Sequence, residues 1–208
     1  CSRVVPDLSV EDKKRQLDFN KIAGVDEAGR GPWAGPVYSA AVILNRNCIP
    51  EGINDSKKIS EKKRLTLYDE IIINHRYGIG CATPDEIDQF NILEATFLSM
   101  RRALENLNIK PDYILVDGNL SPNFTIPHES IIKGDSISLS IAAASIIAKV
   151  ERDKFMLNID KKYPEYQWKK NKGYGTKDHQ HALNTYGVTK HHRKSFSPIR
   201  KILSPSAN

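Results

Sequence analysis

IAGVDEAGRGPWAGP, residues 22–36, is the stretch around which the rest of this 208-residue chain can be arranged. Its first four residues are apolar and predict a strand, which ends on two acids, Asp26 and Glu27. Neighbouring side chains of a strand point to opposite faces, so these two carboxylates are not expected to share one simple role. The glycines that follow let a backbone approach a ligand closely, and Arg30 between two of them offers a planar fork of donors for phosphate or sugar oxygens. An ordinary turn could use the same residues, so this stretch alone does not distinguish a ligand-binding loop from a turn.

The composition is that of a soluble globular protein, long enough for one domain with a small appendage. No apolar run approaches membrane-spanning length, and the charged first twenty residues do not look like a signal peptide. The cysteines, Cys1, Cys48 and Cys81, are odd in number and scattered. We therefore expect a reduced, cytoplasmic setting and neither a disulfide framework nor a zinc site.

The charge is distributed unevenly along the chain. Residues 149–208 carry 14 lysines and arginines against 5 acids, whereas residues 1–148 carry 17 against 20. An acidic part joined to a basic part suits a metal site beside a surface that binds a polyanion. A solvated basic tail would have the same composition, so charge alone does not decide between the two.

Apolar runs alternate with helical patterns and predict an α/β fold. After a polar lead-in over residues 1–19, strands are expected at 21–27, 37–44, 77–82, 113–116 and 126–132, the last interrupted by Pro127. A helix is expected from Ser60, with these residues facing inward: Leu65, Tyr68, Ile71 and Ile72.

A strong helix start lies at Thr83-Pro84-Asp85-Glu86, which combines a capping threonine, a proline at the first position and a glutamate three residues after the cap. Apolar residues behind it are spaced by three and four and predict one long amphipathic helix. They are Phe90, Leu93, Phe97, Met100, Leu104 and Leu107. Another helix is expected to open at residues 134–136, with a buried stripe formed by Ile137, Ile141, Ala144 and Ala148.

Four acids stand at the ends of predicted elements: Asp26 and Glu27 after the first strand, Asp117 after the fourth, and Asp135 at a helix start. If the first and fourth strands are parallel neighbours, Asp26 and Asp117 meet at one edge of the sheet. Clustered carboxylates repel one another, so a cluster implies bound cations, and oxygen ligands without Cys or His favour Mg²⁺ or Mn²⁺ over zinc. Two such ions can hydrolyse a phosphodiester. Each acid alone could instead be a turn residue, and Asp135 a helix cap.

Other catalytic signatures are missing from the sequence. It has no phosphate-binding G-x-x-x-x-G-K-[ST] loop, no G-x-S-x-G elbow and no H-E-x-x-H motif. The pair His191-His192 lacks a third ligand at suitable spacing, so a structural role or a phosphate contact is preferred to a metal site.

The motif at 26–36 resembles the signature of the type 2 ribonucleases H, the prokaryotic ribonuclease HII family. Further family-like motifs follow in order from about residue 21 to 198. They are Asp55-Ser56-Lys57-Lys58, Asp117-Gly118-Asn119, Gly134-Asp135, residues 140–153, Gly173-Tyr174-Gly175-Thr176 and residues 192–198. Trp168 stands where a smaller aromatic residue is expected.

The resemblance implies a ribonuclease-H-like catalytic domain over residues 1–160, with a mixed five-stranded sheet flanked by helices, and a basic helical region over 161–208 that helps to bind substrate. It implies that Asp26, Glu27, Asp117 and Asp135 hold two Mg²⁺ or Mn²⁺ ions. Gly29, Arg30 and Gly31 match the loop that reads a ribonucleotide 2′-hydroxyl, and Tyr174 matches the tyrosine that stacks on the sugar at an RNA–DNA junction. Contacts to backbone phosphates are expected from Lys57, Ser145, Lys149, Arg193 and Ser195.

The expected activity is metal-dependent hydrolysis of the RNA strand of RNA–DNA hybrids, together with incision at single ribonucleotides in duplex DNA, leaving 5′-phosphate and 3′-hydroxyl ends. A monomer is expected, and residues 201–208 hold no clear sliding-clamp peptide. Two rivals are a junction resolvase or transposase on the same scaffold, which would lack a 2′-hydroxyl reader, and a non-catalytic nucleic-acid binder, which would not need four acids.

Overall fold

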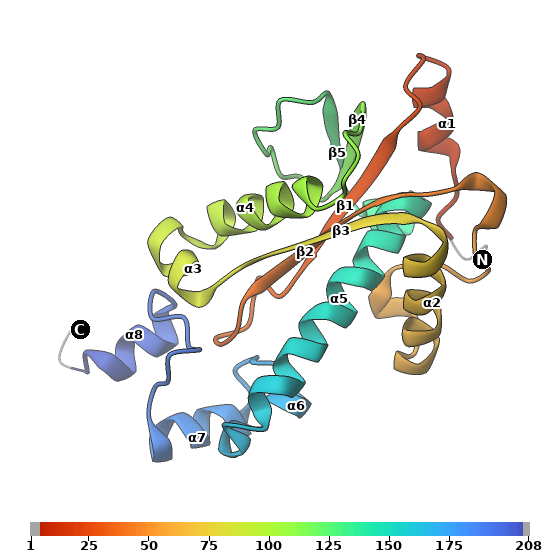
Figure 1. Ribbon diagram of the computed structural model, residues 1–208. Coiled ribbons are helices and arrows are strands. Elements are labelled where there is room, and N and C mark those ends of the chain that lie inside the picture. Colours follow the sequence, from red (N-terminus) through yellow and green to blue (C-terminus); the bar gives the residue numbers. More distant parts are fainter. Residues whose placement is uncertain (1–4, 206–208) are drawn as a thin grey trace.

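Residues 5–205 are described by a computed structural model, which contains one mixed sheet of five strands (Figure 1). The strands stand in the order β3-β2-β1-β4-β5. Antiparallel pairing joins β1 to β2 and β2 to β3, and parallel pairing joins β1 to β4 and β4 to β5. The expected mixed five-stranded sheet is confirmed. The strands are β1 (Ile22–Ala28), β2 (Val37–Ile43), β3 (Arg76–Ala82), β4 (Tyr113–Asp117) and β5 (His128–Ile131).

Helices cover both faces of this sheet (Figure 1). The 22-residue α5 (Leu139–Asp160) lies against β1 and β2, with α2 (Glu61–Asn74) beside it, and α4 (Ile92–Glu105) packs on β2 and β3. Consecutive residues of β2 point to opposite faces of the sheet and enter separate cores. Ala40 packs in the cluster on the α5 side and Ala41 in the cluster on the α4 side. The other helical elements are α1 (Ser9–Arg15), α3 (Pro84–Phe90), α6 (Trp168–Asn171), α7 (Lys177–Tyr186), α8 (Ser197–Leu203) and the 3₁₀ turns η1 (Arg46–Cys48), η2 (Ser56–Lys58), η3 (Gly134–Ser136) and η4 (Pro164–Tyr166).

The centre of the sheet is β1, which is buried from Ile22 to Asp26. The α5 helix begins directly on this strand. A Cβ added to Gly24 would lie 2.2 Å from the carbonyl carbon of Ser140, so only glycine allows the helix to come this close. This contact sets the start of α5, and with it η3, beside the end of β1.

The long amphipathic helix expected after Thr83 is two helices. Thr83 does cap α3 through the predicted capping box, but Asn91 has a φ of +74° and breaks the helical path. Asn91 ends α3 and caps α4 with its side chain, which accepts from the N–H of Glu94; its φ of +74° with a ψ of 166° is a backbone conformation that residues other than glycine rarely adopt. Because the axis changes direction here, Phe90 and Leu93 are 43% and 37% exposed and do not join the buried face.

Two other local expectations differ from the structure. In α2, Leu67 is fully buried while the expected core residue Leu65 is 44% exposed. The stretch 134–136 is a 3₁₀ turn, and α5 starts later, after the capping residue Ser138, which leaves Ile137 partly exposed. Tertiary packing chose the buried face of α2, and the turn at 134–136 places Asp135 outside the helix that it was expected to open.

The C-terminal region lies at the far end of α5 (Figure 1). It folds around an aromatic cluster. Trp168 is fully buried there with Tyr166 and Ile199, and the cluster also contains Met156 of α5 and Ala34 of the loop after β1. The loop at 29–36 is therefore held between the sheet domain and the C-terminal region. Within residues 5–205, no helix is both long enough and apolar enough to cross a membrane. Cys1 and residues 206–208 of the tail considered above lie outside the described residues.

Candidate active site

Three of the predicted acids meet at one edge of the sheet. Parallel pairing puts Val25 opposite Val116, so Asp26 and Asp117 follow side by side where the pairing of β1 with β4 ends; β4 ends on Asp117, and β1 continues to Ala28. Asp135, in η3, joins them, and its backbone N–H donates to Oδ1 of Asp117 at 3.1 Å. One carboxylate oxygen from each of the three lies within 4.8 Å of the others. The predicted parallel neighbourhood of the first and fourth strands is confirmed, and Asp135 caps no helix.

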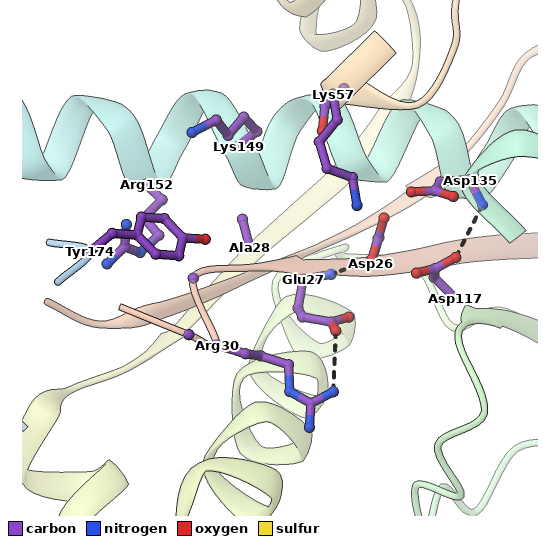
Figure 2. A pocket seen from close by; sticks show the side chains of 13 residues that line it. Asp26, Glu27, Ala28, Arg30, Lys57, Asp117, Asp135, Lys149, Arg152 and Tyr174 are labelled. Carbon is purple, nitrogen blue, oxygen red and sulfur yellow. Dashed lines mark hydrogen bonds and ion pairs between the residues drawn. The ribbon is translucent and has the colours of Figure 1, made fainter. Parts of the chain in front are cut away.

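Glu27 belongs to the same pocket but stands apart from this trio (Figure 2). Its Oε1 lies 3.8 Å from Nη1 of Arg30, and its Oε2 is buried without a hydrogen-bond partner among the described residues. The backbone N–H of Glu27 donates to Oδ1 of Asp26 at 2.8 Å. The opposite orientation of the two adjacent acids, expected from strand geometry, thus leaves one oxygen of Glu27 free for a ligand.

The acids raise one another's pKa. Burial raises the pKa of Asp26 well above its usual range, and the neighbouring carboxylates raise it further. Burial and then the charges of Asp117 and Asp55 raise the pKa of Asp135 to about 6. For Asp117 and Glu27 burial is also the largest cause of a raised pKa. This is the electrostatic pattern of a site that binds a cation, because a bound ion would remove the repulsion.

The donor set fits a hard divalent cation. The cluster of Asp26, Asp117 and Asp135 offers carboxylate oxygens as ligands, and within residues 5–205 no Cys or His lines the pocket. Mg²⁺ and Mn²⁺ prefer such ligands, whereas zinc sites in proteins are dominated by nitrogen and sulfur. The unpaired Oε2 of Glu27 is a further oxygen on the same rim.

A pocket of about 280 Å³ extends from the acids along the loop after β1 (Figure 2). The acids stand at one end and Tyr174 at the other, and Lys57 points toward the acids. The Tyr174 ring is 48% exposed and lies 3.4 Å from where a Cβ of Gly31 would be. Burial lowers the pKa of Lys57, but the surrounding carboxylates outweigh burial and raise it, so the ammonium stays charged. Ten predicted site residues line this pocket: Asp26, Glu27, Gly29, Arg30, Gly31, Lys57, Asp117, Asp135, Lys149 and Tyr174.

Three residues expected to contact phosphates lie elsewhere. Arg193 is fully buried, and its guanidinium donates to the carbonyls of Gly29, Arg30 and Gly35 at 2.6, 2.9 and 2.9 Å. The hydroxyl of Ser145 is buried, donates to a helix carbonyl and accepts from the N–H of Ser56. These groups support the pocket from behind, and neither residue lines it. Their contact with phosphates stays a prediction.

Ser195 is the third. Its hydroxyl and its N–H both donate to Asp88 of α3, at 2.6 and 2.9 Å, and it lines a separate hollow beside Phe196 and Arg200. The family-like segment 192–198 therefore docks the C-terminal region onto α3 and the loop after β1. Sequence reasoning placed these polar groups at the surface because local sequence does not show which carbonyls and carboxylates will face them.

Arg152 is a supporting residue that sequence reasoning did not single out. Its guanidinium is buried and donates to the carbonyls of Ala34, Pro36 and Lys172 at 2.9, 2.9 and 2.6 Å. It packs so closely on Gly29, whose φ is +93°, that a Cβ there would lie 2.0 Å from Nε of the arginine. The spacing held a signal: Arg152 follows Ala148 by four residues, which places it on the buried stripe of α5.

Asp55 was also given no role, although it lies within the motif that contains Lys57. It is 6% exposed, and its Oδ1 accepts from the backbone N–H of Lys57 at 3.0 Å. Its negative charge is one cause of the raised pKa of Asp135. Asp55 thus fixes the turn that carries Lys57 and adds a fifth acid near the cluster.

Comparison with known proteins agrees with the geometry. Residues 23–199 match the family model described as ribonuclease HII. Ribonuclease HII of Wolbachia sp. subsp. Brugia malayi (strain TRS) is 59% identical over 195 residues, 93% of this chain and 94% of that protein. Ribonuclease HII of Ehrlichia ruminantium (strain Gardel) is 51% identical over 206 residues, 96% of this chain and 94% of that protein.

Among solved structures, ribonuclease H2 from Pyrococcus horikoshii OT3 has a TM-score of 0.76 at 29% identity, covering 89% of this chain and 98% of that one. The fold, the acidic edge of the sheet and the relatives therefore lead to one assignment. The chain belongs to the ribonuclease HII family and is a metal-dependent endoribonuclease that acts on RNA–DNA hybrids.

Proposed function

We propose that this enzyme also incises duplex DNA at a single embedded ribonucleotide, and that it works with two Mg²⁺ or Mn²⁺ ions to leave 5′-phosphate and 3′-hydroxyl ends. The observation that carries the proposal is the layout of the pocket: the acids lie at one end, and the 29–31 loop with Tyr174 lies at the other. A substrate strand along this pocket would meet the two ends with neighbouring nucleotides.

The 29–31 loop would select the ribonucleotide. A 2′-hydroxyl is the group that distinguishes RNA from DNA at a given position, and it can donate and accept hydrogen bonds. The carbonyls of Gly29 and Arg30 are already held by Arg193, so the loop presents its remaining backbone groups in a fixed geometry. Tyr174, against Gly31, would pack on the adjoining sugar and make one ribonucleotide sufficient.

The acids would hold the ions and the cations would hold the strand. Asp26, Asp117 and Asp135 converge on one point, with Glu27 on the same rim. Bound divalent ions supply an activated water and stabilise the departing 3′ oxygen. Lys57 and Lys149 line the pocket and would attract the phosphates; Lys149 is at present paired with Asp153 at 2.8 Å.

The expected setting is the reduced cytoplasm, with the chain acting as a monomer. The free thiols Cys48 and Cys81 support the reduced setting.

The proposal is tested with three matched duplexes: all DNA, DNA with one ribonucleotide, and an RNA–DNA hybrid. We expect metal-dependent cleavage of the last two only, with a 5′-phosphate on the downstream product. Cleavage of all-DNA duplex would favour a general nuclease on this scaffold. Cleavage of the hybrid alone would restrict the enzyme to hybrids and contradict the single-ribonucleotide activity. Titration of Mg²⁺ and Mn²⁺ against single-turnover rates tests whether two ions are needed.

A further inference from the structure

A buried cluster of polar aromatic side chains lies behind Tyr174, outside the pocket. Its members are Trp168, His179 and His192, each at most 1% exposed, and none lines the pocket. The two imidazoles approach each other with their Nε2 atoms 2.9 Å apart, and Nε1 of Trp168 lies 3.3 Å from Nε2 of His179. Two apolar side chains could fill this core without any hydrogen-bond partner, whereas buried imidazoles are stable only when they are hydrogen-bonded. We therefore ask what the two histidines contribute.

The contacts at the outer nitrogens determine where each proton lies. Nδ1 of His192 is 3.0 Å from the backbone N of Thr189, which can only donate, so this nitrogen accepts and the ring proton of His192 is on Nε2. Nδ1 of His179 is 2.9 Å from the carbonyl oxygen of Tyr174, which can only accept, so this nitrogen carries a proton. The shared contact then has one direction: His192 donates to His179.

Both rings are neutral in this arrangement, with one proton each. Burial lowers the pKa of His179 and is the largest cause that lowers the pKa of His192 to about 3. The result is a directed chain of hydrogen bonds from the Thr189 N–H through His192 and His179 to the carbonyl of Tyr174. Trp168 adds a second donor at Nε2 of His179.

This chain of hydrogen bonds connects the segments that form the reading end of the pocket. His192 forms an antiparallel bridge with Ala34, beside which the N–H of Gly35 donates to His191. The N–H of Trp33 donates to the carbonyl of Gly173, next to Tyr174. The loop after β1 is therefore fastened to the segment that carries His192, and the Tyr174 loop is fastened to the loop after β1.

Tyr174 itself depends on this support. Within residues 5–205 its hydroxyl makes no hydrogen bond, so its ring is placed by its backbone and by packing alone. The N–H of Tyr174 donates to Asn171, and its carbonyl accepts from Thr176 and from His179. The histidine contact is the one that comes from outside the loop's own turn.

We propose that His179 and His192 are positioning residues for the proposed ribonucleotide reading, acting through the carbonyl of Tyr174 to hold its ring against Gly31. They do not touch substrate. The inference rests on the proposed function and adds to it the element that keeps the reading end in shape.

The test is a double-mutant cycle on the single-ribonucleotide duplex, with kcat and KM measured separately. Tyr174→Ala is expected to lower kcat/KM by about 10- to 100-fold, the range that the loss of one aromatic stack implies. His192→Phe keeps an aromatic ring at this position but removes both ring nitrogens, and it is expected to lower kcat/KM by about tenfold. In the Tyr174→Ala background the same His192→Phe change should cost less than about twofold, because it acts through a side chain already removed.

Conservative variants provide the second readout. The amide nitrogen of asparagine overlies Nδ1 of histidine, and that of glutamine overlies Nε2. His179→Asn, which keeps the donor to Tyr174, should therefore retain more activity than His179→Gln. His192→Gln, which keeps the donor to His179, should retain more than His192→Phe. If the Phe variant does not fold, His192→Asn, which lacks the donor, takes its place in the cycle.

Tyr166→Phe is the matched control, since Tyr166 belongs to the same cluster and the change removes its partly buried hydrogen bond to the carbonyl of Gly187. It should lower thermal stability and leave cleavage unchanged. Three outcomes would each overturn the inference: additive losses in the cycle, full activity of His192→Phe together with His179→Gln, or an unaffected Tyr174→Ala. In each case the unmodified enzyme would still cleave the hybrid and the single-ribonucleotide duplex. Failure of the unmodified enzyme to cut the single-ribonucleotide duplex would instead refute the proposed function.

Discussion

Two regions of this molecule bury charge, and they treat it in opposite ways. At the acidic edge of the sheet, the carboxylates of Asp26, Asp117 and Asp135 lie together at an open pocket, where the charge of Lys57 offsets their mutual repulsion only in part. Behind the loop after β1, Arg152 and Arg193 are buried, and each donates to three backbone carbonyls; within residues 5–205 neither forms a salt bridge with a carboxylate. The carboxylates of the first region lack enough positive charge to balance them, whereas the guanidinium groups of the second have all the hydrogen-bond acceptors named above.

This difference separates binding groups from supporting groups. A carboxylate cluster with raised pKa values gains stability from whatever cation enters, so its energy is available for a ligand. A guanidinium whose donors already meet carbonyls has little to offer a phosphate. Burial and then the charge of Arg152 lower the pKa of Arg193 to about 9, and the charge of Asp88 offsets this only in part. Polar residues in equally family-like motifs thus serve chemistry in one region and architecture in the other.

The largest expected effect comes from the acidic edge. Asp135→Asn or Asp117→Asn should lower single-turnover cleavage of an RNA–DNA hybrid by roughly a thousandfold or more, since metal stabilisation of the transition state is worth several kcal/mol. Folding should survive, because an amide can still accept the bond from the N–H of Asp135 and repulsion decreases. Binding of the duplex, measured without turnover, should change little. Cleavage near the unmodified rate would exclude that acid as a metal ligand.

Arg193→Gln should act on stability first. Three carbonyls of the loop would lose their donors, and we expect the free energy of unfolding to fall by about 2–4 kcal/mol. Arg193→Lys should rescue little, because one ammonium cannot reach three carbonyls set around a planar fork. Chemical denaturation with Arg200→Gln as a control gives the comparison; Arg200 is at an exposed position and donates one bond to Ser195. Equal stability of both variants would contradict a supporting role for Arg193.

The dependence of stability on pH should reflect the buried histidines. His192, which faces His179 and His191, has a folded pKa of about 3, below the unfolded value of about 6.5, so the unfolded chain binds more protons between these limits. The contribution of His192 to the free energy of unfolding is complete above pH 6.5. It falls with the pH, by about 2 kcal/mol between pH 6.5 and 5.

The raised pKa values of the acids act in the opposite direction in metal-free protein, because protonation favours the folded state there. A comparison of unmodified protein with His192→Gln at each pH removes this shared term. The stability difference between the two should shrink as the pH falls. A difference that stays constant from pH 7 to 5 would show that His192 is not held neutral.

The smallest expected effect separates surface cations from buried ones. Binding of an uncleavable duplex should weaken with salt, with a log–log slope of about −0.9 per phosphate contacted. Lys57→Ala and Lys149→Ala should each reduce the magnitude of this slope by roughly one unit, because both line the pocket. Arg193→Gln, measured where it is folded, should leave the slope unchanged. A reduced slope in Arg193→Gln would show that the buried arginine reaches phosphate after all.

Local rules predicted the strands and the positions of the acids well. Apolar runs that end on Asp26 and Asp117 are strands whose carboxyl ends meet, because parallel neighbours end at the same edge of a sheet. The same rules misplaced features that depend on packing. Asn91 breaks a helix that the three-and-four spacing continued, and its φ of +74° has no counterpart in the hydrophobic pattern.

The amino-acid sequence by itself determined the order of elements, the acids at the strand ends and the glycine loop between them, since these follow from periodicity, backbone freedom and residue chemistry over a few positions. Only the tertiary structure decided which polar groups face the pocket. Arg193 bonds to carbonyls more than 150 residues away in the chain, and His192 reaches Tyr174 through His179. Whether a polar side chain is free for a ligand depends on partners brought together by folding, and hydrogen bonding of a buried group requires that such partners be found.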